Sequence, residues 1–453
     1  MSQFDPDTDL PKGARPKEQI TTDPSRPSER MQFRPLMIAV APWVIASAAL
    51  LMLPLVFTNN SALTIMNQMS ITIVFALAYN MLLGQGGMLS FGHAVYAGVG
   101  GFACMHIMNM SDFFASFPLV ILPLFGGLFG MGLAMIVGAF STRSAGTVFA
   151  MISLGVGELI AACSVIIVAF FGGEGGVSGD RTYAQPFFGV EFLQQIEVYY
   201  LTAAWVVLSA LLMYLWSRTP VGRMANAVRD NPERAEFLGY SSRWVRFYSF
   251  VASGFFAGVS GGLFAINYEI LTEENLNTAS SGVILLVTFL GGVGFFFGPI
   301  IGAVVFTLVQ TVLSLQTELW AFYAGSLFLA TVMFFPGGLA GLIMMHVPAF
   351  KMGRARLLIV PYLRTLLPAA IGILGLAALV EMMFHFRHAA TGDNEMTLFW
   401  TTFDSHAILP WIIAGAITLI GLGIARATAP SLKDAWNSAN TAPASQTVKG
   451  GAA

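Results

Sequence analysis

The sequence predicts an all-α fold: a polytopic integral membrane helix bundle with about 10–12 transmembrane segments. Hydrophobic residues make up 56% of the 453 residues and charged residues only 10%, whereas ordinary soluble domains are about 25% charged. Long uncharged runs recur along the chain, and many approach the ~20 residues that a helix needs to cross a bilayer. The placement of Lys and Arg is the third observation, because it fits one membrane topology well.

The expected spans follow the apolar runs in chain order. They are 36–57, 64–83, 88–109, 118–140, 147–171, 196–217, 244–267, 282–297, 298–315, 319–345, 357–382 and 407–425. The pair at 282–297 and 298–315 is interrupted only by "FFFGP". We therefore expect either one broken helix pair or two re-entrant halves there.

With the N-terminus inside, twenty of the 22 Lys and Arg residues fall on the inner side, and the outer loops hold only Arg181 and Arg387. This distribution follows the positive-inside rule and predicts a cytoplasmic N-terminus. The polar, proline-rich residues 1–35 are typical of a disordered tail, and 426–453 is expected to be a second cytoplasmic tail. Cys104 and Cys163 both lie in apolar segments, which argues against a disulfide framework.

The stretch "LGQGGMLSFGHAVYAGVGG" at 83–101 is rich in glycine yet apolar. At membrane depth such a stretch suits close helix packing, or a broken helix that lines a cavity or is buried in protein. His93 is either part of a solute pathway or a hydrogen-bonding partner of a neighbouring helix. A similar run, "GGVGFFFG" at 291–298, gives a weak indication of an internal repeat.

A second glycine pattern predicts helix packing. In "SGFFAGVSGGLFA" the residues Gly254, Gly258 and Gly262 recur every four positions. This doubled GxxxG pattern puts three small residues on one helix face and favours a close helix crossing.

Glu158 lies near the middle of an apolar run. A carboxylate at that depth costs roughly 2.5–3.5 kcal/mol or more in lipid, so it should face protein or water. Two interpretations remain open, a functional group on the solute path and a hydrogen bond within the bundle.

The loop at 218–243 is the one long, highly charged inner loop between spans. Its residues 221–238 can form helix if Pro232 opens a second short helix after Asn231, and Gly239 would end that helix. Such a charged run is often only a solvated face, but a short helix lying on the membrane also makes a docking site for a cytosolic partner.

Several motifs are absent from the sequence. It contains no GxxxxGK[ST] phosphate-binding loop, no HExxH, no CxxC and no nucleophile constellation. We therefore expect no bound metal, no cofactor and no enzymatic activity of the chain itself. The basic residues lie beside membrane spans, so they give no reason to expect nucleic-acid binding.

Five motifs, in order, carry a resemblance to a known family. They are "ALAYNMLLGQGGMLSFGHAVYAGVGG", "ISLGVGELI" followed by "GGEGGVSG", "GRMANAVRDNPERAEFLGYSSRWVRFYSFVASGFFAGVSGGLFA", "VTFLGGVGFFFGPIIGA" and "FFPGGLAGLI". The chain resembles the LivM-type permease subunits of bacterial branched-chain amino acid ABC importers over about residues 64–345. Residues 1–35 and the segment from 354 onward, with two extra spans, lie outside the resemblance.

The resemblance implies a domain organisation and a set of partners. Residues 36–345 would form the permease domain, with coupling loop 218–243, and 346–425 a C-terminal extension with two additional helices. The implied partners are a second, LivH-like permease chain, two cytosolic ATP-binding subunits, a periplasmic solute-binding protein and the lipid bilayer. The implied location is the bacterial inner membrane.

The resemblance also assigns roles to particular residues. The family's coupling region corresponds to residues 221–240, and the charged helices there can meet only cytosolic partners. We therefore expect the ATPase contact to include Arg229, Glu233, Glu236 and Gly239. The expected translocation path includes Asn80, His93, Tyr96 and Glu158.

The sequence-based reading is thus an ATP-driven permease subunit for branched-chain or other hydrophobic amino acids. Three alternatives remain open. The same permease type could serve urea, short amides or aromatic acids. An ion-coupled secondary carrier would use Glu158 as its proton site. An integral-membrane enzyme would need a catalytic constellation that the sequence lacks.

Overall fold

The computed structural model describes residues 34–110, 118–388, 395–398 and 401–440. Most of the expected N-terminal tail and the last part of the expected C-terminal tail lie outside these ranges. The chain divides into two units, Met1–Met52 and Leu53–Ala453. Helix α1 (Arg34–Val56) is a single apolar helix that falls mainly in the first unit.

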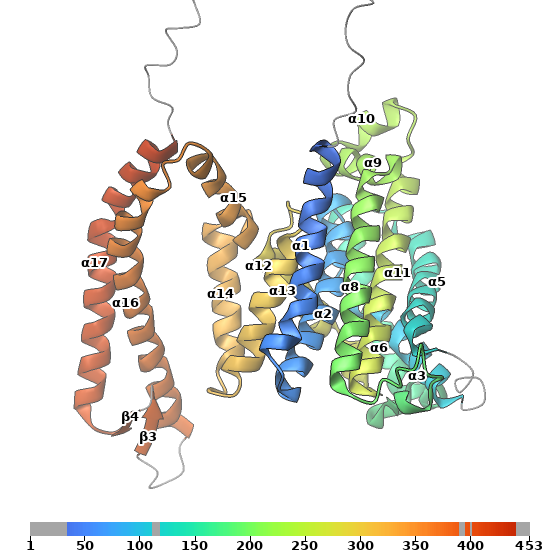
Figure 1. The fold of residues 1–453 in the computed structure, drawn as a ribbon, viewed down its shortest axis with the longest axis horizontal. Helices are drawn as coiled ribbons and strands as arrows, with labels where there is room; N and C mark the ends of the chain where they lie inside the picture. The colour runs from blue at the N-terminus through green and yellow to red at the C-terminus, as the bar shows by residue number, and fades with distance from the viewer. Residues whose placement is uncertain (1–33, 111–117, 389–394, 399–400, 441–453) are drawn as a thin grey trace, which may run out of the picture. The chain divides into compact units, whose positions relative to one another are not determined.

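The second unit is almost entirely helical (Figure 1), and it confirms the all-α class. Its helices up to the coupling loop are α2 (Asn60–Asn80), η1 (Met81–Gln85), α3 (Ala94–Asn109), η2 (Leu119–Ile121), α5 (Leu122–Ser141), α6 (Gly146–Ile166), α7 (Val168–Phe171), η3 (Gly173–Gly175), η4 (Arg181–Tyr183) and α8 (Gln195–Arg218). The remaining helices are α9 (Pro220–Asp230), α10 (Pro232–Phe237), α11 (Ser242–Tyr268), η5 (Glu273–Asn275), α12 (Thr278–Gly291), α13 (Gly298–Leu308), η6 (Val309–Leu313), α14 (Trp320–Phe334), α15 (Gly338–Lys351), α16 (Arg356–His388) and α17 (Ile408–Asn440).

Among the described residues, seven helices are long and apolar enough to cross a membrane, and the pair α14 and α15, bent by 45°, makes an eighth candidate. Three shorter apolar helices, Ala41–Val56, Thr278–Gly291 and Gly298–Leu313, fall on three further expected spans. The expected span at 88–109 forms a helix only from Ala94. Glycine disfavours helix because it loses more conformational freedom on folding than other residues, and the glycine-rich residues before Ala94 are not helical. The ambiguous pair after residue 282 forms two short helices that pack against each other.

Helix α11 is the central helix of this unit, and 78% of its most apolar window is buried. It packs against α2, α3 and α5. A Cβ added at Gly258 would lie 2.2 Å from the carbonyl oxygen of Gly126 on α5, and one added at Gly254 would lie 2.4 Å from the Cβ of Ala134. At Gly262 it would lie 2.9 Å from the Cα of Pro123. All three glycines of the four-residue pattern therefore lie where α11 and α5 approach closely.

Four short strands complete the described structure. The antiparallel pair β1 (Val177–Ser178) and β2 (Ile270–Leu271) joins the loop after α6 to the segment after α11. The second antiparallel pair, β3 (Glu395–Leu398) and β4 (Thr401–Asp404), lies between α16 and α17.

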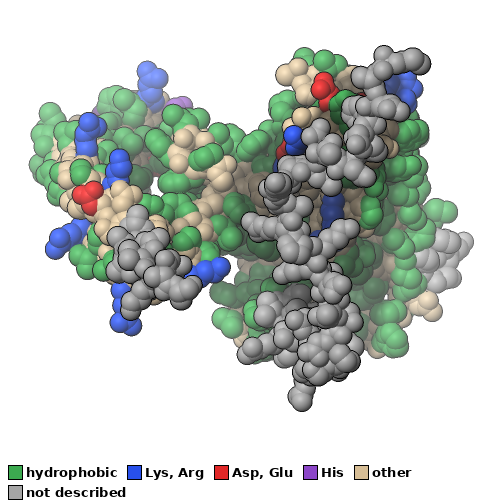
Figure 2. Space-filling model, turned by 90° about the horizontal axis from the view of Figure 1, so that it is seen from above, with side chains coloured by type: hydrophobic (Ala, Val, Ile, Leu, Met, Phe, Trp, Pro, Cys, Tyr) green, Lys and Arg blue, Asp and Glu red, His purple; other side chains and the backbone are tan. Residues whose placement is uncertain are grey.

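Hydrophobic side chains cover much of the described surface (Figure 2). Large apolar side chains such as Ile166 and Leu419 are 77% and 76% exposed. A soluble monomer rarely exposes so much contiguous apolar area. This surface is therefore suited to contact with lipid.

Candidate translocation and coupling sites

The coupling loop folds as two short helices with defined ends. The Thr219 hydroxyl accepts from the Gly222 N–H at the start of α9, and the Asn231 side chain accepts from the Arg234 N–H at the start of α10. Pro232 occupies the first helical position of α10. Gly239 follows α10 with φ of +87°, a conformation that suits glycine. The predicted division of this loop at Asn231–Pro232 and its stop at Gly239 are confirmed.

The tip of this loop is apolar as well as charged. Phe237 is 91% exposed and Leu238 is 67% exposed. Glu233 is exposed, and Glu236 is exposed while accepting a 2.6 Å hydrogen bond from the Ser242 hydroxyl. Aromatic side chains are enriched at protein interfaces, so the exposed Phe237 makes this tip a candidate docking site.

The Arg229 side chain contacts the glycine-rich segment after α2 rather than the exposed tip of the loop. Its Nη1 donates to the backbone carbonyl of Gly84, and its Nε lies 2.9 Å from the carboxylate of Asp230. Its side chain also lies against Gly87, where an added Cβ would be 2.6 Å from the Arg229 Cγ. The coupling loop is thus joined directly to the glycine-rich break that follows α2.

The two glycine-rich breaks meet at this junction. Asn80 at the end of α2 donates a 3.3 Å hydrogen bond to the Phe295 carbonyl in the turn between α12 and α13. A Cβ added at Gly84 would lie 2.6 Å from the carbonyl oxygen of Val293 in the same turn. The resemblance between the two glycine runs therefore corresponds to two helix breaks that touch each other.

His93 is fully buried at the start of α3. Ser253 Oγ donates a 2.6 Å hydrogen bond to the Ala78 carbonyl and lies 3.0 Å from His93 Nε2. Because a hydroxyl has one hydrogen, Ser253 must accept from His93 Nε2–H. The imidazole also stacks on Phe75 and contacts Tyr79. His93 thereby joins α3 to α2 and α11.

Tyr96 belongs to the same aromatic cluster. Its ring lies 5.4 Å from that of His93 and 5.3 Å, edge-on, from that of Phe250 in α11. Like His93, it is almost completely buried. In this conformation both residues are part of the helix core rather than of an open path.

Glu158 lies on a different face. It is exposed near the middle of α6 and accepts a hydrogen bond from the Thr278 hydroxyl at the start of α12. Its neighbours Met151 and Leu159 are 65% and 62% exposed. This face of α6 therefore combines a carboxylate with apolar side chains.

A cavity of about 260 Å³ lies between α2, α3, α11 and α12. Its polar lining comes mainly from amide, hydroxyl and phenol groups, and Gln68 Nε2 lies 3.4 Å from Gln310 Oε1. Apolar side chains such as Ile71 and Phe264 complete the wall. None of the four expected path residues lines this cavity. Ala97 and Gly98, one turn after His93, do line it.

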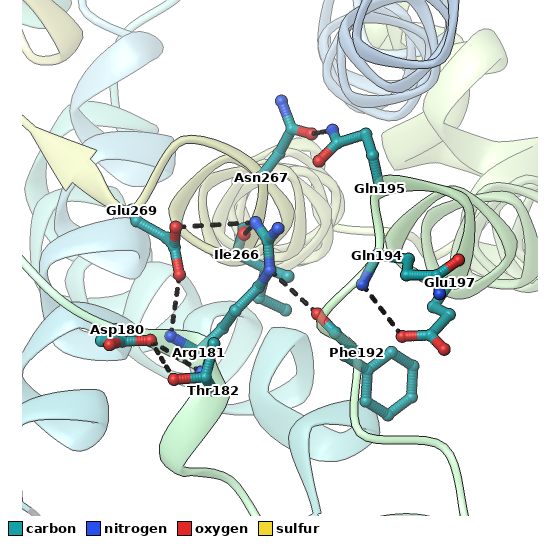
Figure 3. A network of polar contacts seen from close by, with 10 residues as sticks. All are labelled: Asp180, Arg181, Thr182, Phe192, Gln194, Gln195, Glu197, Ile266, Asn267 and Glu269. Carbon is teal, nitrogen blue, oxygen red and sulfur yellow. Dashed lines mark hydrogen bonds and ion pairs between the residues drawn. The ribbon is translucent and has the colours of Figure 1, made fainter. Parts of the chain in front are cut away.

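Arg181 organises the loop between α6 and α8 (Figure 3). It is only 9% exposed, and it donates from Nε to the Phe192 carbonyl at 3.1 Å and from Nη1 to the Ile266 carbonyl at 3.0 Å. Its guanidinium lies 3.7 Å from the Glu269 carboxylate, which also accepts from the Arg181 backbone N–H. Arg181 thus fixes the loop to the end of α11.

The residues beside Arg181 stabilise the turn. Donation from the hydroxyl and backbone N–H of Thr182 lowers the pKa of Asp180 below its ordinary value. A short hydrogen bond of 2.8 Å joins Gln195, at the start of α8, to Asn267 in α11. This second link supports the same loop position.

Sequence reasoning missed three features of these sites. Arg181 entered only as one of two outer basic residues, although an arginine beside a glycine-rich loop was a visible signal. The prediction for this loop named its charged residues and did not include Phe237 and Leu238. Ser253 stands at the start of the quoted glycine pattern, but no local rule indicates that it contacts His93.

The bundle of apolar helices defines a multi-pass membrane protein. A profile of the family described as "Branched-chain amino acid transport system / permease component" matches residues 61–336. The match spans more than half of the chain, so the chain belongs to this family of ABC-type permeases, and the resemblance found in the sequence is confirmed. The C-terminal helices α16 and α17 lie outside the matched region.

Curated relatives agree with this assignment. The high-affinity branched-chain amino acid transport system permease protein LivM of Escherichia coli (strain K12) is 25% identical over 293 residues, which are 59% of this chain and 67% of the relative. The galactose/methyl galactoside import permease protein MglC of the same organism is 26% identical over 260 residues, 54% of this chain and 76% of the relative. The autoinducer 2 import system permease protein LsrC of Klebsiella pneumoniae is 30% identical over 159 residues, 33% of this chain and 46% of the relative. No solved structure matches the chain significantly.

Proposed function

We propose that the chain is the permease subunit of an ATP-driven importer for branched-chain or other hydrophobic amino acids in the bacterial inner membrane. The LivM relatives are named as branched-chain amino acid permeases, which supports this substrate class over sugars. The mixed lining of the 260 Å³ cavity also suits a solute with an apolar side chain and polar ends. The N-terminus lies in the cytoplasm, as the distribution of Lys and Arg favours.

The observation that carries the proposal is the arrangement of α9 and α10. An exposed apolar tip at Phe237 and Leu238 provides a docking surface for a cytosolic ATP-binding subunit. On the other side of the same loop, Arg229 binds the Gly84 carbonyl. A movement imposed on the tip would thus reach the break between α2 and α3. Glu233 and Glu236 add charge to the docking surface.

A second, related permease chain covers the α6 face that carries Glu158. Exposure of a carboxylate to lipid near mid-span is costly, whereas a protein partner or an aqueous path between two subunits removes that cost. The solute path would then run along this face. Asn80, His93 and Tyr96 would support the helix breaks behind it.

The loop fixed by Arg181 belongs to the outer side in this topology. A solute-binding protein would deliver the amino acid there, next to β1 and β2. Residues 36–345 act as the permease domain, and 346–425 form an additional pair of membrane helices. ATP hydrolysis is performed by separate chains.

The test is uptake in proteoliposomes by the chain assembled with ATP-binding and solute-binding partner proteins. We expect ATP-dependent accumulation of leucine, isoleucine or valine, and none of galactose, urea or benzoate. Exclusive uptake of one of the other solutes would contradict the substrate class. Uptake that continues without ATP hydrolysis but stops on addition of an uncoupler would contradict the ATP-driven mechanism.

A further inference from the structure

A large cavity of about 840 Å³ lies between α15 and the C-terminal helices α16 and α17. Its wall is almost entirely apolar and includes Leu342 and Phe350 of α15, Leu366 of α16 and Leu432 of α17. All three helices lie beyond residue 336, where the family match ends, so the cavity belongs to the part of the chain that the permease assignment leaves unexplained. A buried water needs two to four polar partners, so a space with so few polar groups is a poor site for water.

Two polar side chains of α17 stand at this cavity. Lys433 is its one charged lining residue, and Trp436 lines it one turn further along the helix. Among the described residues, neither the Lys433 ammonium nor the Trp436 indole N–H has a hydrogen-bond or ion-pair partner. Both are therefore free to donate to an anionic group at this end of the cavity. The neighbouring Asp434 carboxylate is exposed and does not line the cavity.

The cavity is framed by fixed contacts rather than by loose helices. His346 of α15 lies 2.6 Å from the Leu342 carbonyl through Nδ1 and 2.6 Å from the Tyr362 hydroxyl of α16 through Nε2. Since the carbonyl can only accept, Nδ1 carries the proton, and in the neutral imidazole Nε2 accepts from Tyr362. The His346 ring also contacts Trp436 edge-on, with the centroids 5.0 Å apart. These contacts join α15, α16 and α17 around one end of the space.

The same end of the molecule is basic. Figure 2 shows Lys and Arg side chains gathered over the part formed by the C-terminal helices. The sequence places six basic residues in the two segments 351–364 and 426–433: Lys351, Arg354, Arg356, Arg364, Arg426 and Lys433. By the positive-inside rule this end faces the cytoplasm, where anionic lipid headgroups attract basic side chains.

We propose that this cavity is a binding site for an anionic phospholipid. Its acyl chains fill the apolar space between α15 and the pair α16–α17. Its headgroup phosphate accepts from Lys433 and from the Trp436 indole N–H. Basic pockets between membrane helices on the cytoplasmic side are a known form of lipid site, and Trp is favoured at the membrane interface. The lipid would join the two extra helices to the permease domain.

The experiment uses the full-length chain in nanodiscs and the fluorescence of Trp436. This signal is the difference between the unmodified chain, which has eight Trp, and the Trp436→Phe variant. Brominated phosphatidylglycerol and brominated phosphatidylcholine are titrated as quenchers. We expect the anionic lipid to quench Trp436 at about fivefold lower concentration, the effect of one lysine near an anionic lipid.

Variants and a competitor test the headgroup contact. Lys433→Gln should remove the preference for phosphatidylglycerol, whereas Lys351→Gln, a basic residue of the same end outside the cavity, should retain it. Equal quenching by both lipids, or no quenching, would overturn the proposal. An equal loss in both variants would instead indicate general surface charge and overturn it too. Displacement of the lipid by inorganic phosphate would identify a soluble anion as the ligand and would also overturn the proposal.

Discussion

The Arg229 guanidinium donates a hydrogen bond to the Gly84 carbonyl, 145 positions earlier in the chain. This contact joins α9 of the coupling loop to η1, the turn that follows α2 before the chain breaks ahead of α3. Gly87, with φ of +65°, leaves room for the stem of the same arginine. A side chain at Gly87 would therefore displace the arginine as well as strain the backbone.

Replacing Arg229 tests this connection. Arg229→Gln should lower solute uptake by roughly tenfold or more while ATP hydrolysis continues, because hydrogen bonds to charged groups contribute about 1.5–3 kcal/mol. The measurement is uptake and ATPase rate in the same proteoliposomes. Arg234→Gln, on exposed α10, is the control and should leave the ratio of transport to hydrolysis unchanged. If the ratio of transport to hydrolysis were the same in both variants, the Gly84 contact would not couple ATP hydrolysis to transport.

The loop tip gives a second prediction. Phe237→Ser should weaken the association of the ATP-binding subunit by roughly tenfold or more, since removing a buried aromatic anchor costs about 2 kcal/mol or more at an interface. The chain should fold normally, because Phe237 is 91% exposed. Co-purification of the ATP-binding subunit measures the effect.

A matched control for the tip is Phe188→Ser. Phe188 is 92% exposed but lies in the loop between α6 and α8, which faces the other side of the membrane in the expected topology. Its replacement should leave co-purification unchanged. If only this variant lost the ATP-binding subunit, the loop between α6 and α8 would have to lie on the cytoplasmic side, opposite to the expected topology.

The tip and the Arg229 contact show what the sequence can and cannot predict. The helix ends of the coupling loop follow from Asn231, Pro232 and Gly239, since caps and breaks depend on a few consecutive residues. The apolar runs likewise predicted the membrane helices. The partner of Arg229 could not be predicted, because it depends on how distant helices pack.

His93 illustrates the same limit. Its residue type in a glycine-rich stretch allowed a pathway role or a hydrogen bond to a neighbouring helix. The distances to Ser253 and the surrounding rings show such a hydrogen bond in this conformation. A role in transport remains a proposal. The cavity at Lys433 could not be predicted either, because it depends on how α17 packs against α15 and α16.

The α11–α5 crossing gives a third prediction. Gly258→Leu should damage folding or assembly rather than selectivity, because even a Cβ would lie 2.2 Å from the Gly126 carbonyl oxygen. Overpacking of this kind costs about 1–3 kcal/mol. Size-exclusion chromatography of the detergent-solubilised complex is the measurement. Gly132→Leu on α5, where an added Cβ meets nothing within 4 Å, should elute normally. An intact Gly258→Leu complex with altered substrate preference would contradict the packing role.

Arg181 gives a fourth prediction. Arg181→Met leaves the carbonyls of Phe192 and Ile266 without their donor, and a buried unsatisfied acceptor costs about 1–3 kcal/mol. The loop between α6 and α8 should then be cut faster by a protease added from outside. Arg387→Met, at the exposed end of α16, is the control and should not change cleavage of this loop. Unchanged protection in the Arg181 variant would show that β1 and β2 hold the loop without it.

Glu158 tests the energy source and the local contact together. An ATP-driven permease does not need a proton-binding carboxyl, so Glu158→Gln should keep most of its ATP-driven uptake. The glutamine Oε1 can still accept from the Thr278 hydroxyl, as Glu158 Oε1 does. Glu158→Leu should do worse, because it leaves Thr278 without this acceptor and costs about 1 kcal/mol for the lost hydrogen bond.

The measurement is uptake against ATP concentration at equal pH on both sides of the membrane. Thr278→Val is the matched control, and its defect should be no larger than that of Glu158→Leu. Complete loss of uptake in Glu158→Gln, with normal assembly and ATPase binding, would instead indicate that the ionisable carboxyl itself takes part in transport.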